Sequence, residues 1–313
     1  MAGDHPAPML TLGGRRGGTS LVELMVALAL FGVIGIATLR ALDRQARFHG
    51  GMLAILESRA QHAAAHEAIA TELRTVSPAA GDLARLTDSS VAFRLPVASG
   101  VACAVAGGGV DLIPDTLAVG PGFAAARTAP QAGDTAWLFD EGPGDTRGDD
   151  RWLAFPVTTA SRAIDACLGG PHVDPVLDAG RRSWRLALGG SVPATVTPGA
   201  PVRLTRMARF ALYRSGTEHW LGFAEAQPGS GTWITIQPVS GPYVPYNAAS
   251  PPASGVALMG NDSSGSAPAS SADVASITLS TRTRTTRAVR MDGVARGRYS
   301  DSLHSRIALR NRP

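Results

Sequence analysis

A long apolar run near the amino terminus sets the strongest limit on what this chain can fold into. Residues 21–39 carry one charged side chain, Glu23. A helix of about 19 residues is nearly 30 Å long, which matches the hydrocarbon core of a bilayer, so the run can cross a membrane once. A carboxylate in such a segment is costly in lipid unless it has a partner, which makes Glu23 a candidate functional residue.

The residues before the run have an unusual order. Residues 15–18 read Arg-Arg-Gly-Gly, directly ahead of the apolar segment. In a secretory signal peptide the small-residue cleavage site follows the apolar region, which is then removed. Here a cut between Gly18 and Thr19 would leave the apolar run on the mature protein. The alternative is an ordinary single-span anchor whose Glu23 reaches toward the membrane interface.

Residues 18–28 read Gly-Thr-Ser-Leu-Val-Glu-Leu-Met-Val-Ala-Leu. This segment resembles the prepilin cleavage and N-methylation motif of type IV pilins and type II secretion pseudopilins. The resemblance implies that a membrane peptidase cuts after Gly18 and methylates the new terminus at Thr19, where the family most often has phenylalanine. It also implies that Glu23 pairs with a terminal amine during assembly, because a buried carboxylate needs a facing cation. A start at Met1 or at Met9 leaves the motif unchanged.

The resemblance carries further expectations for the whole chain. Length and a large head are most similar to minor pilins of the W type or minor pseudopilins of the J type, which initiate or cap a filament. The implied partners are other pilins or pseudopilins, the prepilin peptidase/methylase and an inner-membrane assembly platform, with no cofactor. The implied location is the bacterial inner membrane, single-pass with a periplasmic head, or the filament tip at the cell surface.

Helical spacing continues beyond the membrane run. The apolar positions that recur on one face are Leu42, Ala46, Leu53, Leu56, Ala60 and Ala63. The pattern predicts a helix that ends at Ser77–Pro78, because proline pushes the preceding residue out of helical geometry. Gly50 and Gly51 interrupt the pattern and mark either a bend or melting point, or a short loop between two helices.

Two histidines lie one helical turn apart in the second half of this pattern. His62 and His66 have a spacing that suits a metal, but no third or fourth ligand stands nearby. We therefore expect both side chains on the exposed surface of the helix.

Composition changes to glycine, proline, threonine and short apolar bursts after about residue 78, which predicts a β-rich head. Expected strands are 91–95, 101–105, 135–139, 152–157, 183–188, 202–213, 219–223, 232–239 and 302–309. The clearest hairpin joins Tyr213 to His219, with Ala208, Phe210 and Leu212 on one face. A helix on that face would complete a core. About 235 residues follow the helix, so we expect long insertions or a divided sheet.

The predicted fold class is therefore α+β and pilin-like, with a long N-terminal helix packed on an antiparallel sheet head with long loops. The expected parts are a leader (1–18), the membrane-spanning part of the helix (19–40), its amphipathic part (41–77) and a periplasmic head (78–313). Residues 261–272, rich in serine and glycine, predict a surface loop.

Cys103 and Cys167 are the two cysteines of the chain. Both fall in the part expected outside the cytoplasm if the positive residues stay inside. A disulfide between them is the simplest interpretation, and two free buried thiols are the alternative. Two thiols alone do not make a zinc site.

All 29 basic side chains other than histidine are arginine, and nine of them lie from residue 282 onward. Such a patch could contact phosphates in DNA uptake, but stacking aromatics are scarce there, so nucleic-acid binding is not our main expectation. Residues 140–150 are acidic and could offer oxygen ligands to calcium. Their spacing does not match an EF-hand, and we expect a solvated loop and no metal site.

The sequence holds none of the common signatures of an enzyme. It has no phosphate-binding glycine loop, no nucleophile elbow and no dense cluster of His, Asp and Glu. We therefore expect no catalytic residues. A membrane-anchored periplasmic binding domain that never enters a filament remains the alternative function.

Overall fold

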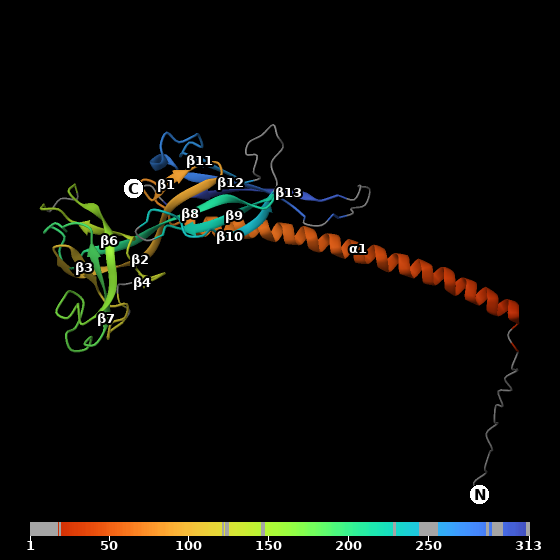
Figure 1. The fold of residues 1–313 in the computed structure, drawn as a ribbon, viewed down its shortest axis with the longest axis horizontal. Helices are drawn as coiled ribbons and strands as arrows, with labels where there is room; N and C mark the ends of the chain where they lie inside the picture. Colours follow the sequence, from red (N-terminus) through yellow and green to blue (C-terminus); the bar gives the residue numbers. More distant parts are fainter. Residues whose placement is uncertain are drawn as a thin grey trace, which may run out of the picture. The chain divides into compact units, whose positions relative to one another are not determined.

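The computed structural model describes residues 18, 20–120, 122, 125–144, 148–227, 230–243, 256–285, 288–289 and 297–310. It is an α+β protein with one long helix and a large antiparallel sheet (Figure 1). The chain divides into two compact units, residues 1–54 with 288–297 and residues 55–287 with 298–313. The elements in chain order are α1 (Leu21–Leu73), β1 (Leu83–Leu86), β2 (Ser90–Ala106), β3 (Gly109–Leu112), β4 (Ala125–Ala126), β5 (Thr135–Asp140), β6 (Arg151–Ile164), β7 (Arg182–Leu188), β8 (Pro201–Ser215), β9 (Glu218–Glu225), β10 (Gln237–Tyr243), β11 (Val256–Asn261), the 3₁₀ turn Ser271–Asp273, β12 (Ser276–Arg284) and β13 (Ser300–Ala308).

Helix α1 is continuous over 53 residues. Gly50 and Gly51 are helical, so the alternative of two helices joined by a loop is wrong. The helix ends at Leu73, before the stop that Ser77–Pro78 predicts. Its end tightens into shorter bonds, with the amide of Val76 donating to the carbonyl of Leu73 at 3.0 Å. These bonds satisfy carbonyls that have no partner further along the helix.

In the second unit, α1 covers a sheet with the strand order β1-β2-β8-β9-β10-β12, and β11 and β13 flank β12. The hydrophobic core between helix and sheet contains Ile69 and Leu73 of α1, both fully buried. Phe93 of β2 stacks on Phe210 of β8 at 5.9 Å between ring centroids. The core therefore forms where the predicted apolar face of β8 meets the predicted helix.

A second group of strands closes on itself. Successive antiparallel pairings run β2–β3–β7–β6–β5–β8, and β8 pairs back with β2, which gives a ring of six strands. Its interior is a separate hydrophobic cluster that includes Leu112, Leu138, Leu186 and Leu204, each no more than 1% exposed. In Figure 1, β3, β6 and β7 gather at one end of the head and β11, β12 and β13 at the other. Over the described residues, the two groups of strands are joined through β2 and β8 into one 13-stranded sheet, so the sheet is not divided.

Strands β2 and β8 are long enough to serve both regions. The sequence predicts two strands over 91–95 and 101–105, but these are one strand, β2, of 17 residues. Pro96 lies at a register shift in the pairing of β2 with β8, between Pro96 and Ala98. A bulge tolerates proline and bends the strand, so Pro96 does not end it.

The other strand predictions are confirmed only in part. The hairpin of β8 and β9 is confirmed, but its connection is only Gly216–Thr217, shorter than expected. The strand expected at 232–239 is displaced and forms at Gln237–Tyr243. Strands β1, β3, β4, β11 and β12 were not predicted. Residues 262–270 lie between β11 and the 3₁₀ turn, close to the expected surface loop.

The prediction that His62 and His66 lie on the helix surface is wrong. His62 is 2% exposed and His66 is 9% exposed. Both lie on the face of α1 that packs on the sheet. Buried residues recur on this face every three or four positions, at Ile55, Ser58, His62, His66 and Ile69.

Candidate functional site

The start of α1 carries the residues that the sequence singles out. Gly18 and Glu23 are described, whereas Thr19 lies outside the described residues. Ser20 and Glu23 hold each other: the Glu23 amide donates to Ser20 Oγ at 3.2 Å, and the Ser20 amide donates to Glu23 Oε2 at 3.4 Å. This reciprocal arrangement is a capping box, which satisfies two amides at the helix start.

Sequence reasoning missed this role of Glu23. The signal was present, because Ser20 and Glu23 have the Ser-x-x-Glu spacing of a capping box directly before an apolar run. Glu23 therefore has a local structural function in a single chain. The carboxylate has two oxygens, and Oε2 is the one within reach of the Ser20 amide.

Residues 21–39 of α1 form an apolar rod in the first unit. Every residue from Leu21 to Gly50 is exposed within this chain, and the helix is long and apolar enough to cross a membrane. The one hydroxyl in the rod, on Thr38, donates to the carbonyl of Ile34 at 2.9 Å. No charged side chain lies between Glu23 and Arg40. These features are compatible with a single-pass membrane anchor.

Charges return at the end of the apolar rod. The guanidinium of Arg47 pairs with the carboxylate of Asp43, one turn earlier, with Nε donating to Oδ1 at 3.0 Å. An acid placed four residues before a base is the favourable order on a helix. A charged end of this kind suits a membrane–water boundary, which is the place the sequence predicts for it.

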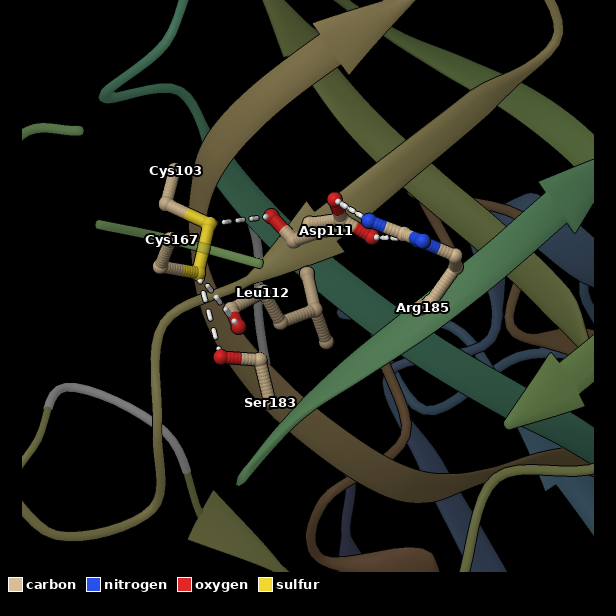
Figure 2. The surroundings of a disulfide bond; sticks show 6 residues. All are labelled: Cys103, Asp111, Leu112, Cys167, Ser183 and Arg185. Carbon is tan, nitrogen blue, oxygen red and sulfur yellow. Dashed lines mark hydrogen bonds and ion pairs between the residues drawn. A yellow bond between two sulfur atoms is a disulfide. The ribbon is translucent and has the colours of Figure 1, made fainter. Parts of the chain in front are cut away.

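A disulfide joins Cys103 of β2 to Cys167, in the connection after β6 (Figure 2). The two Cα atoms are 5.3 Å apart, and each cysteine is 3% exposed. The hydroxyl of Ser183 donates to Cys167 Sγ at 3.2 Å. The alternative of two free thiols is therefore wrong.

Charged groups fix the strands beside this disulfide. Arg185 of β7 donates two hydrogen bonds to the carboxylate of Asp111 of β3, at 2.8 and 2.9 Å, as Figure 2 shows. A bidentate pair of this kind is geometrically specific. The Asp111 carbonyl oxygen lies 3.2 Å from Cys103 Sγ, so the ion pair and the disulfide belong to one cluster.

The acidic loop is held by internal hydrogen bonds where it is described. Asp140 is fully buried, and hydrogen bonds from Thr195, Gly142 and Arg151 hold the pKa of its carboxyl below the usual range. Asp149 Oδ2 accepts from the amide of Gly144 at 2.8 Å. Residues 145–147 lie outside the described part. Across the described ranges, no three His, Cys, Asp or Glu side chains are grouped so that they could hold a metal ion.

The arginine-rich end is only partly described. Arg287, Arg290, Arg296 and Arg312 fall outside the described residues. Arg284 lies 3.6 Å from Glu218, and Arg306 donates to Ser276 Oγ at 2.7 Å. Two of the described arginines thus have partners within the sheet.

A groove of about 730 Å³ lies on the edge of β2, between the places where β1 and β4 pair with it. Its charged lining residues are Asp82, Arg127, Arg203 and Arg310. Arg127 makes a bidentate pair with Glu72, and Arg203 lies 3.5 Å from Asp82. Most of its charge is therefore satisfied within the chain.

Comparison with known proteins gives no further guide: no protein-family model, no curated protein and no solved structure matches this chain.

Proposed function

We propose that this protein is a minor pilin or minor pseudopilin, a structural subunit that initiates or caps a type IV pilus or a type II secretion pseudopilus after cleavage between Gly18 and Thr19. The observation that carries the proposal is the order of features along α1. A Gly-Thr-Ser-Leu-Val-Glu motif leads into a helix that is fully exposed over its apolar half and buried on one face over its second half.

The exposed apolar half supports assembly as well as anchoring. A helix that is apolar all round is stable in water only when something covers it. Lipid covers it before assembly, and helices of neighbouring subunits would cover it in a filament. Small residues, including Gly32 and Gly35, leave open space on the rod, since no described atom outside the adjacent helix backbone lies within 4 Å of a Cβ built on either. Such positions let helices approach closely.

The disulfide supports an exported head. Disulfides persist in oxidising compartments such as the bacterial periplasm and are rare in the cytoplasm. Placing Cys103 and Cys167 outside agrees with the orientation expected if the positive residues of the leader stay inside. The expected partners are therefore other pilins or pseudopilins, the prepilin peptidase and an inner-membrane assembly platform. No catalytic role is proposed.

Blocking the cut tests this function directly. Gly18→Leu removes the small residue at the proposed cleavage site and leaves the helix start at Ser20 intact. We expect the variant to accumulate in the inner membrane at full precursor mass and to be absent from sheared filaments or from cross-links to other pilins. Gly17→Leu is the matched control, because it changes a neighbouring glycine and should allow cleavage. Normal incorporation of uncleaved Gly18→Leu protein would contradict a requirement for cleavage. Absence of the unmodified protein from filaments would support the alternative of a simple membrane anchor.

A further inference from the structure

The face of α1 that packs on the sheet carries an unusual row of polar side chains. Ser58, His62 and His66 are 5%, 2% and 9% exposed. They meet Thr281 and Thr283 of β12, which are 0% and 2% exposed. Buried polar groups are costly unless they are hydrogen-bonded, so the partners of this row decide what it does.

The row and the strands form one continuous chain of hydrogen bonds. Ser58 Oγ lies 2.6 Å from Thr283 Oγ1, which lies 2.8 Å from His62 Nε2. His62 Nδ1 lies 2.6 Å from Thr281 Oγ1, which lies 3.0 Å from His66 Nε2. The chain ends where His66 Nδ1 meets Ser305 Oγ of β13 at 2.5 Å. Six side chains thus tie the helix to two strands.

One further contact sets the direction of the chain. His62 Nε2 also lies 3.2 Å from the carbonyl oxygen of Asp301, which can only accept. His62 therefore carries its proton on Nε2, and its Nδ1 accepts from the Thr281 hydroxyl. Thr281 Oγ1 then accepts from His66 Nε2–H, and His66 Nδ1 accepts from the Ser305 hydroxyl. The pattern is fully satisfied when both imidazoles are neutral.

We propose that His62 and His66 form a pH-sensitive latch, which fastens the second half of α1 to β12 and β13 when both rings are neutral and releases it on acidification. The latch does not depend on cleavage of the leader. It concerns the segment of α1 that follows the apolar rod, residues 55–73, and the strands on which that segment packs.

A proton on either ring breaks the pattern. Protonated His62 would donate from Nδ1 to Thr281, whose own hydroxyl would then keep an acceptor only if His66 changed tautomer and the Ser305 hydroxyl turned away. Protonated His66 would place a cation beside His62 and would need the Ser305 hydroxyl to turn away. Both changes act at the interface of the helix with the sheet.

The charged groups around the latch offset such a proton only in part, because Asp301 favours a charged His62 but burial outweighs this effect. The Asp301 carboxylate is held by Arg59 of α1, with Nε at 3.2 Å, and Asp301 offers His62 its carbonyl instead. His304 Nδ1, on β13, lies 2.7 Å from Ser280 Oγ. His304 also adds repulsion toward a charged His66. The side chains of Arg282 and Arg284 alternate to the other face of β12 from Thr281 and Thr283.

Burial agrees with the geometry. It lowers the pKa of His62, and burial together with His62 and His304 lowers the pKa of His66 to about 4. A histidine whose pKa is lowered in the folded state binds a proton more tightly when the interface between helix and sheet is open. Lowering the pH from about 6.5 to 4 therefore favours the open interface, whereas a pH change above 6.5 leaves the opening equilibrium unchanged.

Amide hydrogen exchange of the full chain in lipid nanodiscs tests the latch. The readout is the protection factor, which removes the intrinsic pH dependence of exchange. From pH 7.5 to pH 5 we expect protection over residues 55–73 and 276–284 to fall about thirtyfold, as one histidine with this shift requires. Protection over β3 and β7, in the ring of six strands, should stay constant. No fall, or an equal fall in all strands, would overturn the proposal.

Substitutions separate the latch from general acid sensitivity. His62→Gln/His66→Gln keeps neutral hydrogen-bonding groups and should abolish the pH response. His49→Gln, at an exposed histidine of the same helix, should keep it in full. Persistence of the response in the double variant would count against the latch. If the double variant does not fold, NMR titration of ¹³C-histidine in the unmodified chain decides: a ring of the pair that titrates near pH 6.5 in the protected state contradicts the proposal.

Discussion

Glu23 has one observed role and one proposed role, which a single substitution would confuse. It closes a capping box with Ser20 inside one chain, and the prepilin motif implies that its charge pairs with the terminal amine of a neighbour. Capping requires an acceptor at this position, which glutamine also provides. Pairing with an amine requires the negative charge itself. The two roles can therefore be separated at the level of single residues.

We predict that Glu23→Gln strongly reduces incorporation into filaments, because it removes the charge but keeps the cap. Ser20→Ala should have little effect on incorporation, because it removes the cap, worth about 1 kcal/mol, and keeps the charge. Quantitative immunoblotting of the sheared filament fraction, relative to the membrane fraction, measures both. A larger loss in Ser20→Ala than in Glu23→Gln would show that helix capping is the main role of Glu23.

Arg206 is 8% exposed and binds two carboxylates in the head. Its Nε donates to Asp134 at 2.7 Å and its Nη1 to Glu225 at 2.8 Å. Arg206→Ala leaves Asp134, which is 1% exposed, without its cation and should lower the free energy of unfolding by roughly 3–5 kcal/mol.

Arg127→Ala is the matched control for Arg206. Arg127 also makes a bidentate pair, with Glu72, but its side chain is 53% exposed, so its loss should cost no more than about 1 kcal/mol. Urea denaturation followed by tryptophan fluorescence compares the two variants. Equal destabilisation would mean that burial does not determine the effect of these ion pairs.

Some residues were placed correctly from the sequence and others were not, for physical reasons. Ala208, Phe210 and Leu212 alternate as apolar residues on a strand, so their common face was predictable. The buried face of β12 was not predictable, because Thr281 and Thr283 lie on it. Threonine is usually exposed, so the alternation of threonine with arginine over residues 281–284 did not indicate a buried face. His62 and His66 were misplaced because their partners lie more than 200 residues away.

At the scale of elements, α1 is the part that the sequence predicts best. Its length follows from continuous helical periodicity and from the absence of proline between residues 21 and 77. Gly50 and Gly51 lower helix stability locally without ending the helix. Gly51 lies near Val289, since a Cβ there would be 3.7 Å from the Val289 Cβ, whereas Gly50 has open space around it.

We predict that Gly50→Ala stabilises the middle of α1 by about 1 kcal/mol, because alanine loses less backbone entropy than glycine and meets no neighbour here. Slower amide exchange over residues 46–54, by about fivefold, is the expected result for the full chain in nanodiscs. Ala46→Gly is the reciprocal variant and should speed exchange over the same residues. An unchanged rate in Gly50→Ala would mean that the glycine pair does not limit the stability of the helix.

The strand pairings were less accessible from sequence than α1. Ring closure depends on β8 pairing back to β2, across about 100 residues of chain, and no local pattern specifies such a contact. Strand β3 was missed because Gly109 and Asp111 interrupt its short apolar pattern. Asp111 is buried there only because Arg185 of β7 pairs with it.

At the scale of the whole molecule, the described part of the head contains two large hydrophobic cores that share β2 and β8. One lies between α1 and the sheet, and the other lies inside the ring of six strands. The disulfide lies in a third, smaller cluster with Ile113 and Val173, on the ring side of the head, since Cys103 lies on β2 beyond the bulge at Pro96. This division gives the two regions different sensitivity to reduction.

We predict that Cys103→Ser/Cys167→Ser lowers the stability of the ring region by about 4 kcal/mol, the chain-entropy value for a crosslink that spans 64 residues. The region covered by α1 should lose less. Amide exchange in β3 and β7, compared with β9 and β12, reports the two regions separately. Reductant added to the unmodified protein should reproduce the pattern, and reductant should not affect the double variant. A uniform loss across both regions would contradict the division.

The central claim is that the apolar half of α1 remains on the mature protein and starts at a newly formed amine. The most direct test is intact mass spectrometry of the protein purified from its native membrane, with fragmentation of the amino terminus. We expect a chain that begins at Thr19, with or without one added methyl group, and that retains residues 21–39. A chain that still carries residues before Thr19, or one cut after the apolar run, would contradict this claim.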